Sequence, residues 1–105
     1  MDKLFIKNRK EQNVSVIVEV SHEQKGLAFV MHGLGGFKEQ DHIQTFAQAF
    51  KDAGLTVVRF DTTNTFGESD GEYADATTTN YFEDLEDVIH WASIQDFYQE
   101  PFYLV

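Results

Sequence analysis

The chain has 105 residues, a length that fits one small domain or a piece of a larger one and is too short for two cores. Hydrophobic residues make up 42% and aromatic residues 14%, which excludes wholesale disorder and favours a packed interior. The formal net charge is −10, and residues 61–105 hold eleven acidic residues and no lysine or arginine. Nucleic acids and anionic membrane surfaces need a cationic face, so neither is expected as a partner.

The sequence contains no cysteine, which excludes disulfides, a thiolate nucleophile and cysteine-based zinc sites. The N-terminal apolar run has only three residues, far fewer than a signal-peptide core or a membrane span needs. A cytoplasmic location is the default expectation. The acidic residues near Asp70 lack the spacing of a calcium-binding loop, so no metal site is predicted.

The first predicted element is an antiparallel hairpin over residues 1–20. Two β-rich runs, residues 4–7 and 14–20, flank a polar stretch, and valines occupy every second position of the second run. This alternation predicts one buried and one solvated face. The next apolar run, residues 27–31, is continuous, which is typical of a strand buried on both faces of a mostly parallel sheet. It leads directly into glycines, and residues 27–36 form a predicted unit of strand and loop.

Two helices and two strands are predicted after this unit. Apolar residues at three- and four-residue spacing predict a helix over residues 41–53, ended by a glycine, and a strand follows at residues 55–60. A polar loop, residues 61–78, leads to a second helix over residues 79–95, whose early acidic residues suit the positive end of the helix dipole. The apolar residues 102–105 begin a further strand.

This alternation predicts an α/β fold, in which parallel strands follow the antiparallel hairpin and two helices form the crossovers. The sheet is expected to be incomplete over residues 1–105, because no helix follows the strand at residues 102–105 to cover it. We therefore expect a single partial domain. Its last strand leaves an apolar edge that is available for pairing with another chain.

The turn His32-Gly33-Leu34-Gly35-Gly36 follows a strand end, which is where ligands bind in open α/β sheets. Glycines adopt backbone conformations closed to other residues and let main-chain N–H groups approach a ligand. The turn is therefore a candidate site for an anion or for an oxyanion that develops during a reaction. The glycine content alone fits a plain strand-to-helix turn equally well.

The surrounding sequence resembles the α/β-hydrolase family, in which an apolar strand ends in His-Gly-x-Gly-Gly and the next strand ends in an aspartate. The motif stands here as residues 32–36, and the next strand ends in Phe60-Asp61. The resemblance spans about residues 27–105, and the leading hairpin is compatible with it. It implies the N-terminal portion of a serine hydrolase that acts on ester or related acyl bonds.

The resemblance also assigns roles within the glycine-rich turn. In the α/β hydrolases the loop after this strand supplies one N–H of the oxyanion hole, and the residue after the nucleophile supplies the other. Carried over to this sequence, the backbone N–H of Leu34 is the first donor. The other residues shape the oxyanion loop: His32, Gly33, Gly35 and Gly36.

A second match follows Asp61, because the family has a Gly-x-Ser loop there and this sequence has Gly67-Glu68-Ser69-Asp70-Gly71. Thr63-Asn64 departs from the family, which has an Arg-Gly pair at that point. The segment also fits G-x-S-x-G, the pattern of a nucleophile elbow, but an elbow lies directly between a strand and a helix. Ser69 lies eight residues past Asp61 and well before the next helix. The predicted structural loop residues are Asp61, Gly67, Ser69 and Gly71.

In the family the nucleophile follows the fifth strand, which here is residues 102–105, so the resemblance places the nucleophile beyond Val105. The triad runs in chain order Ser, Asp or Glu, His, and all four histidines of this chain precede that position. The chain is therefore expected to lack the nucleophile, acid and His of the triad and to be inactive alone. The substrate of the complete protein would be a small acyl compound, and no cofactor is implied.

Two other functions fit parts of the pattern. A strand, a Gly-x-Gly turn, a helix and a strand ending in an acid imitate half of a dinucleotide-binding unit, but the fingerprint meets Lys38 where it needs a glycine. The other is a non-catalytic protein that depends on assembly. In that case residues 102–105 would pair with a second copy or with a complementing chain.

Overall fold

The computed structural model describes residues 2–105. Five strands form one mixed sheet with the order β1-β2-β4-β3-β5. The strands are β1 (Asp2–Lys7), β2 (Asn13–Glu19), β3 (Gly26–Val30), β4 (Leu55–Phe60) and β5 (Tyr103–Leu104). β1 and β2 pair antiparallel, β2 is antiparallel to β4, and β3 runs parallel to both β4 and β5. The predicted antiparallel hairpin followed by parallel strands is confirmed.

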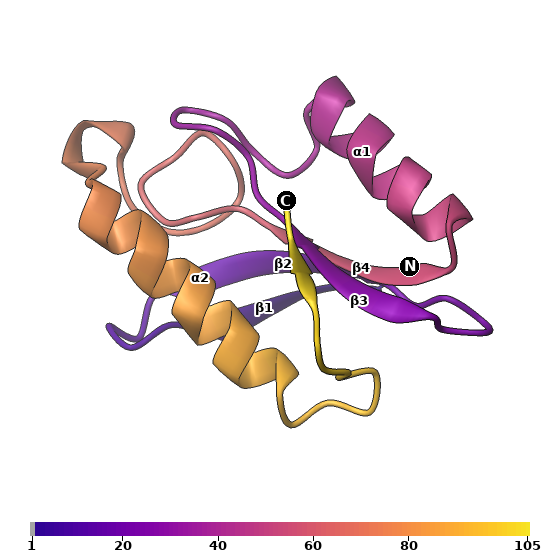
Figure 1. Cartoon of the computed structure of the whole chain (residues 1–105). Coiled ribbons are helices and arrows are strands. Elements are labelled where there is room, and N and C mark those ends of the chain that lie inside the picture. The colour runs from indigo at the N-terminus through magenta and orange to yellow at the C-terminus, as the bar shows by residue number, and fades with distance from the viewer. Residues whose placement is uncertain (1) are drawn as a thin grey trace.

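Two helices connect the parallel strands and cover opposite faces of the sheet (Figure 1). α1 (Asp41–Asp52) joins β3 to its neighbour β4, and α2 (Thr78–Ala92) takes the chain from β4 across β3 to β5. The predicted crossover helices are thereby confirmed. Within residues 2–105 no helix is long and apolar enough to cross a membrane.

α1 is amphipathic and buries Ile43 and Ala47 against Val30 and Val57 of the sheet. The helix ends one residue before the predicted limit of residue 53, because Gly54 takes a left-handed conformation with φ +92° and turns the chain into β4. A left-handed glycine after the last turn is a common way for a helix to stop.

α2 covers the other face, where its apolar residues meet the larger of the two cores. Its first turn is fixed by a capping box, in which Thr77 Oγ1 accepts from the Asn80 N–H (3.0 Å) and Asn80 Oδ1 accepts from the Thr77 N–H (2.6 Å). Such a box satisfies two backbone donors that a helix leaves free. The buried apolar residues of this core are Ile6, Val14, Val16, Val18, Leu27, Phe29, Val58, Phe60, Leu85, Val88 and Ala92.

The prediction that the second helix covers residues 79–95 is wrong at its C-terminal end, since α2 ends at Ala92. Ser93 caps the helix and its Oγ donates to the His90 carbonyl (2.6 Å). The chain then reverses and places Phe97 against Trp91, with ring centroids 6.0 Å apart and both residues on the core. The packing of Phe97 thus ends the helix before the predicted limit at residue 95.

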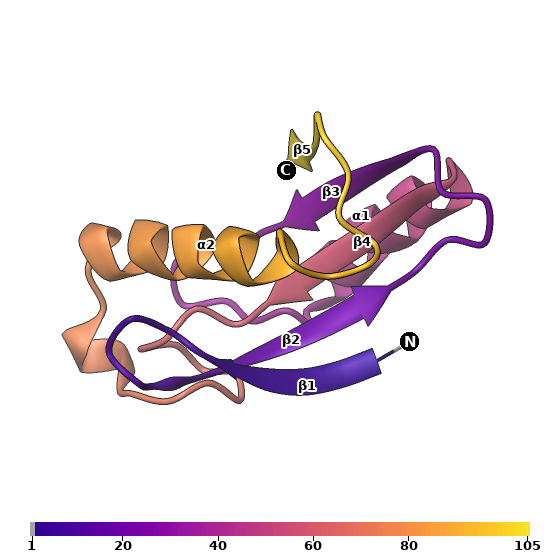
Figure 2. The same ribbon diagram turned by 90° about the horizontal axis from the view of Figure 1, so that it is seen from below.

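The prediction of one solvated face holds for β1 and is wrong for β2. In β1 the residues Lys3, Phe5 and Lys7 are exposed on the outer face, whereas in β2 Ser15 and Ile17 are buried as well as the valines. β2 lies inside the sheet, between β1 and β4 (Figure 2). On its second face, Glu19 binds Arg59 of β4 (3.1 Å) and Lys51 of α1 (3.5 Å).

Candidate oxyanion site

The glycine-rich turn after β3 is a tight reverse turn. The Gly36 N–H donates to the Gly33 carbonyl (2.9 Å), and Gly35 has φ +74°. A four-residue turn with a positive φ at its third residue only is of type II, which needs glycine at that position. A side chain on Gly36 would meet the Gly33 carbonyl and the Gln40 amide, so this glycine is required by close approach.

Leu34 is the second residue of this turn, and its N–H takes no part in the hydrogen bond that closes it. Among residues 2–105 the Leu34 N–H donates no hydrogen bond. Leu34 is 73% exposed, so the residue lies at the surface. The turn therefore presents a backbone donor that is free to bind a ligand at the carboxyl end of β3, where ligands bind in such sheets.

The side chain of His32 links the turn to the end of β4. Its buried ring is bonded on both nitrogens, since Nε2 accepts from the Thr62 N–H (3.1 Å) and Nδ1 lies 2.7 Å from the Gly33 carbonyl. Only the neutral ring with its proton on Nδ1 satisfies both partners. Burial lowers the pKa of His32 below its usual value, which favours the same neutral form. The ring of Tyr81 packs edge-on against it, with centroids 5.6 Å apart.

Lys38 ties the loop after β3 to the end of β4. Its backbone N–H donates to Asp61 Oδ1 (2.6 Å) and its Nζ donates to Asp61 Oδ2 (2.7 Å), and both side chains are completely buried. Burial by itself would lower the pKa of Lys38, but the ion pairs with Asp61 and Glu68 outweigh burial and raise it. A buried charge without its partner is costly, so this pair fixes the relative position of the two loops.

Glu68 extends the same ionic network to the surface. It binds Lys3 of β1 and Lys38, and its N–H donates to Asp61 Oδ2 (2.8 Å). The ammonium groups of Lys3 and Lys38 lower the pKa of Glu68 to about 2. The carboxylate is therefore charged at neutral pH.

The Gly67-Glu68-Ser69-Asp70-Gly71 segment is packed against the end of β4. Ser69 is buried, and its Oγ donates to the Asp61 carbonyl (2.7 Å) while it accepts from the Ser15 N–H. A Cβ on Gly67 would overlap the Asp61 carboxylate, and Gly71 has φ +100°. No helix follows until the short 3₁₀ turn Tyr73–Asp75 and then α2. Both hydrogen-bonding capacities of the serine are used within the loop.

The end of β5 lies beside the loop after β3. The Val105 N–H donates to the Phe29 carbonyl and the Met31 N–H donates to the Val105 carbonyl, both at 2.9 Å. Because β3 and β5 are parallel, their carboxyl ends meet at the same edge of the sheet. Val105 therefore lies next to Met31. Met31 precedes Leu34 by three residues.

Comparison with solved structures identifies this architecture. The chain superposes on Est1E from Butyrivibrio proteoclasticus, solved with ferulic acid bound, with a TM-score of 0.88, 22% identity and coverage of 97% of this chain and 41% of that chain. It superposes on an alpha-beta serine hydrolase homologue from Coxiella burnetii with a TM-score of 0.81, 24% identity and coverage of 98% and 50%. The chain has the fold of the N-terminal part of an α/β hydrolase.

A further α/β serine hydrolase, XC6422 from Xanthomonas campestris, matches with a TM-score of 0.74, 25% identity and coverage of 90% of this chain and 44% of that chain. Two curated sequences described as an uncharacterized 31.7 kDa protein in the traX-finO intergenic region of Escherichia coli are 37% identical over 70 residues. The match covers 67% of this chain and 24% of those relatives, so this chain spans about a quarter of their length. No protein-family model matches the chain.

The strand order of this α/β-hydrolase fold differs from that of a dinucleotide-binding unit. β4 and β5 lie on opposite sides of β3, and the antiparallel β2 occupies the far side of β4. A dinucleotide unit continues with parallel strands on that side and opens its helix at the glycines. Here α1 begins at Asp41, several residues after Gly36, so the glycines do not form the N-terminus of a helix.

Two polar anchors of this site, Lys38 and Asp84, are not among the site residues that the sequence predicts. In the sequence pattern Lys38 is only a mismatch to a glycine, and Asp84 is one of several acidic residues of the predicted helix. Asp84 is buried and accepts from both the N–H and the hydroxyl of Thr63 at 2.7 Å, which holds the loop after β4 against α2. The sequence signal that could have indicated this burial is the position of Asp84 directly before Leu85, on the side of the helix that faces the core.

A shallow apolar hollow of about 370 Å³ borders Leu34. We call it the Leu34 hollow. Its lining comes from the end of β3, the turn and the first turns of α2, and it contains no ionisable group other than the Tyr81 phenol. The lining residues are Met31, Gly33, Leu34, Thr77, Thr78, Tyr81 and Phe82.

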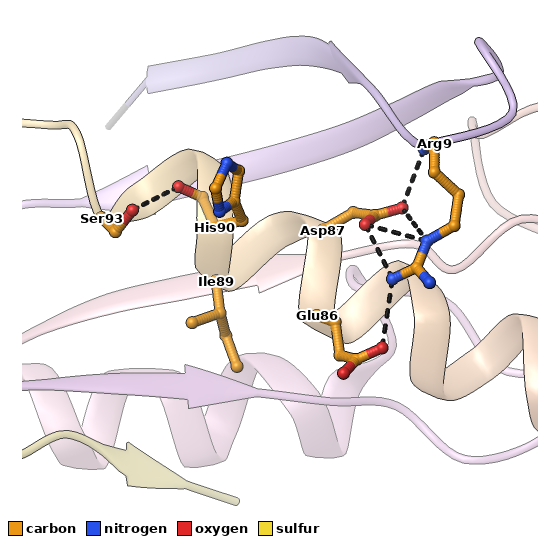
Figure 3. A pocket seen from close by; sticks show the side chains of 6 residues that line it. All are labelled: Arg9, Glu86, Asp87, Ile89, His90 and Ser93. Atoms are coloured by element: carbon orange, nitrogen blue, oxygen red, sulfur yellow. Dashed lines mark hydrogen bonds and ion pairs between the residues drawn. The ribbon is translucent and has the colours of Figure 1, made fainter.

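A larger surface hollow of about 530 Å³ lies on α2 near the β1–β2 turn (Figure 3). Arg9 reaches from that turn onto the helix, where its guanidinium binds Asp87 (2.9 Å) and Glu86 (3.1 Å). None of its lining residues belongs to the turn after β3. Its charged groups are paired with one another. The contacts of Arg9 form a surface clamp between the hairpin and the helix. Among residues 2–105 no three histidine or acidic side chains gather closely enough to hold a metal ion.

Proposed function

We propose that this chain supplies the N-terminal part of a serine hydrolase that acts on ester or related acyl bonds, with the Leu34 N–H as one of its two oxyanion donors. The observation that carries the proposal is the unpaired Leu34 N–H on a type II turn at the carboxyl end of β3. The α/β-hydrolase fold supports it, because that fold uses a backbone N–H from this loop for the same purpose.

In this proposal the donor acts on the oxygen that becomes negative when an ester carbonyl is attacked. A donor held in place before the reaction costs no reorganisation when the charge develops, and removing one such donor typically costs about 10² to 10³ in rate. His32 holds the Gly33 carbonyl and the Lys38–Asp61 pair holds the following residues. These contacts support a rigid rather than an adjustable donor.

The remaining catalytic groups are proposed to lie outside this chain. In the fold, the nucleophile and the second donor follow the fifth strand. The end of β5 lies beside Met31, so a segment that continues from Val105 would arrive next to the Leu34 N–H. Ser69 is not proposed as the nucleophile, because its hydroxyl donates to the Asp61 carbonyl and is buried.

The proposed substrates are small acyl compounds. Est1E, the similar structure with ferulic acid bound, supports this class, since ferulic acid is a carboxylic acid. A p-nitrophenyl ester assay tests the proposal: the 105-residue chain should give no turnover, and a longer protein that continues past β5 should. Turnover by the 105-residue chain that is lost in the Ser69→Ala variant would overturn it, because Ser69 would then be the nucleophile.

The edge of β5 supports a second, assembly-related proposal. Tyr103 and Leu104 are both more than half exposed, and β5 pairs only with β3 among the strands of residues 2–105. Unpaired apolar edges readily accept another strand. We propose that a second copy covers this edge when the 105-residue chain is alone in solution, and that a complementing chain covers it where one is present. Light scattering that gives a monomer at millimolar concentration would contradict self-association.

A further inference from the structure

We infer that the Leu34 hollow binds the apolar acyl group of the substrate, an inference that rests on the proposed function and names the substrate class. The hollow and the donor share a residue, since the Leu34 backbone offers the N–H and its side chain forms one wall. An ester whose carbonyl oxygen accepts from this N–H places its acyl chain within reach of the same wall.

The chemistry of the lining selects the kind of acyl group. Two of its lining residues, Leu34 and Phe82, are large apolar residues that are 73% and 60% exposed, and no acidic or basic side chain lines it. Large exposed apolar side chains that gather beside a polar donor are typical of ligand sites. A charged acyl group would find no partner here, so the occupant is a hydrocarbon chain or an unsubstituted ring.

The walls of the hollow are fixed before any ligand binds. Tyr81 packs edge-on against His32, and its hydroxyl lies 3.5 Å from His32 Nδ1. Thr77 is held by the capping box of α2. A Cβ added to Gly33 would meet no atom within 4 Å, so the floor of the hollow beside the turn is open. A preformed site of this kind binds without the cost of ordering its walls.

An NMR titration of the ¹⁵N-labelled chain with acetate, butanoate and hexanoate tests the inference. The carboxylate of each acid probes the Leu34 N–H and the hydrocarbon probes the hollow. We expect the Leu34 amide to shift with all three acids, and affinity to rise about two- to fourfold for each added methylene that the hollow covers. In Phe82→Ala the gain with chain length should be lost while acetate binding is kept.

Phe46→Ala is the matched control, because Phe46 is a comparably exposed phenylalanine on α1, outside the Leu34 hollow. It should retain the full chain-length dependence. The inference is overturned if acetate shifts the Leu34 amide but hexanoate binds no more tightly, a result that leaves the oxyanion proposal standing. A chain-length gain that depends on Phe82, with no shift of the Leu34 amide, supports the hollow and contradicts the donor. Loss of the gain in both variants overturns the inference.

Discussion

The loops after β3 and β4 lie against each other at the same edge of the sheet, yet they use their polar groups in opposite ways. In the loop after β4, the Asp61 carboxylate accepts three hydrogen bonds and the Ser69 hydroxyl both donates and accepts. In the turn after β3, the Leu34 N–H remains unpaired among residues 2–105. Polar groups that are satisfied within the fold stabilise it, whereas an exposed and rigid donor is available to a ligand.

This difference separates two motifs that the sequence presents with equal clarity. Gly67-Glu68-Ser69-Asp70-Gly71 matches the pattern of a nucleophile elbow, but its serine is already bonded. The Gly33–Gly36 turn matches a loop pattern of low specificity, but its free N–H is placed at the ligand edge. Predictions that perturb the satisfied loop should therefore change stability, and those that perturb the turn should change ligand binding or rate.

The largest expected effect on stability is from Asp61→Asn. The amide cannot neutralise the buried Lys38 ammonium, and breaking a buried ion pair on one side typically costs about 3 to 5 kcal/mol. Urea unfolding should report a loss near the lower end of this range, because Glu68 and Glu39 still contact the Lys38 ammonium. Asp52→Asn, at an exposed position of α1, is the control and should stay within about 0.5 kcal/mol. Equal losses in the two variants would show that the Lys38–Asp61 pair does not anchor the loops.

Ser69→Ala is expected to have the next largest effect. The Ser15 N–H loses its acceptor in a buried place, and an unsatisfied buried donor typically costs about 1 to 3 kcal/mol. Ser93→Ala removes an exposed serine at the end of α2 and should cost less. Thermal unfolding compares the two. If Ser69→Ala lowers stability no more than Ser93→Ala, the serine is not a structural anchor.

His32 should make stability depend on pH. Burial lowers its pKa in the folded state, so the unfolded chain binds its proton first as the pH falls. Stability is therefore complete above the ordinary histidine pKa of about 6.5 and declines below it, by at most about 1.4 kcal/mol per pH unit. Urea unfolding between pH 7.5 and 5.5 should show this decline, and His32→Gln should reduce it. His42→Gln, at an exposed position of α1, should leave the slope unchanged, and a slope that His32→Gln does not alter would contradict the assignment.

Arg9→Ala should have the smallest effect, although Arg9 pairs with three carboxylates, as many as Lys38 does. Its partners Glu83, Glu86 and Asp87 lie on the surface of α2, where water and salt screen the charges. The melting temperature should fall less than in Ser69→Ala, and the difference from wild type should shrink in 1 M NaCl. A loss as large as that of Asp61→Asn, independent of salt, would show that the surface clamp is as important as the buried pair.

Much of the fold followed from the sequence, because apolar periodicity and glycine positions report on local structure. The continuous run before His32 and the spaced apolar residues of the two helices predicted the strand and helix order. The pairings that anchor the loops could not be predicted in this way, although Asp61 and Ser69 were predicted as structural loop residues. Lys38 and Asp61 are 23 residues apart, and Thr63 and Asp84 are 21 apart, so their pairing depends on how the sheet brings the loops together. The limit of α2 likewise depended on the packing of Phe97.

The central claim is that the Leu34 N–H binds the oxyanion, and a pair of variants tests it in the longer hydrolase that the proposal requires. Leu34→Pro removes the N–H while keeping the turn, since proline suits the second position of a type II turn and no hydrogen bond within residues 2–105 is lost. Leu34→Ala keeps the N–H and removes the side chain. For p-nitrophenyl acetate we expect kcat/KM of Leu34→Pro to fall about 10²- to 10³-fold below that of Leu34→Ala. Equal kcat/KM in two folded variants would contradict the claim.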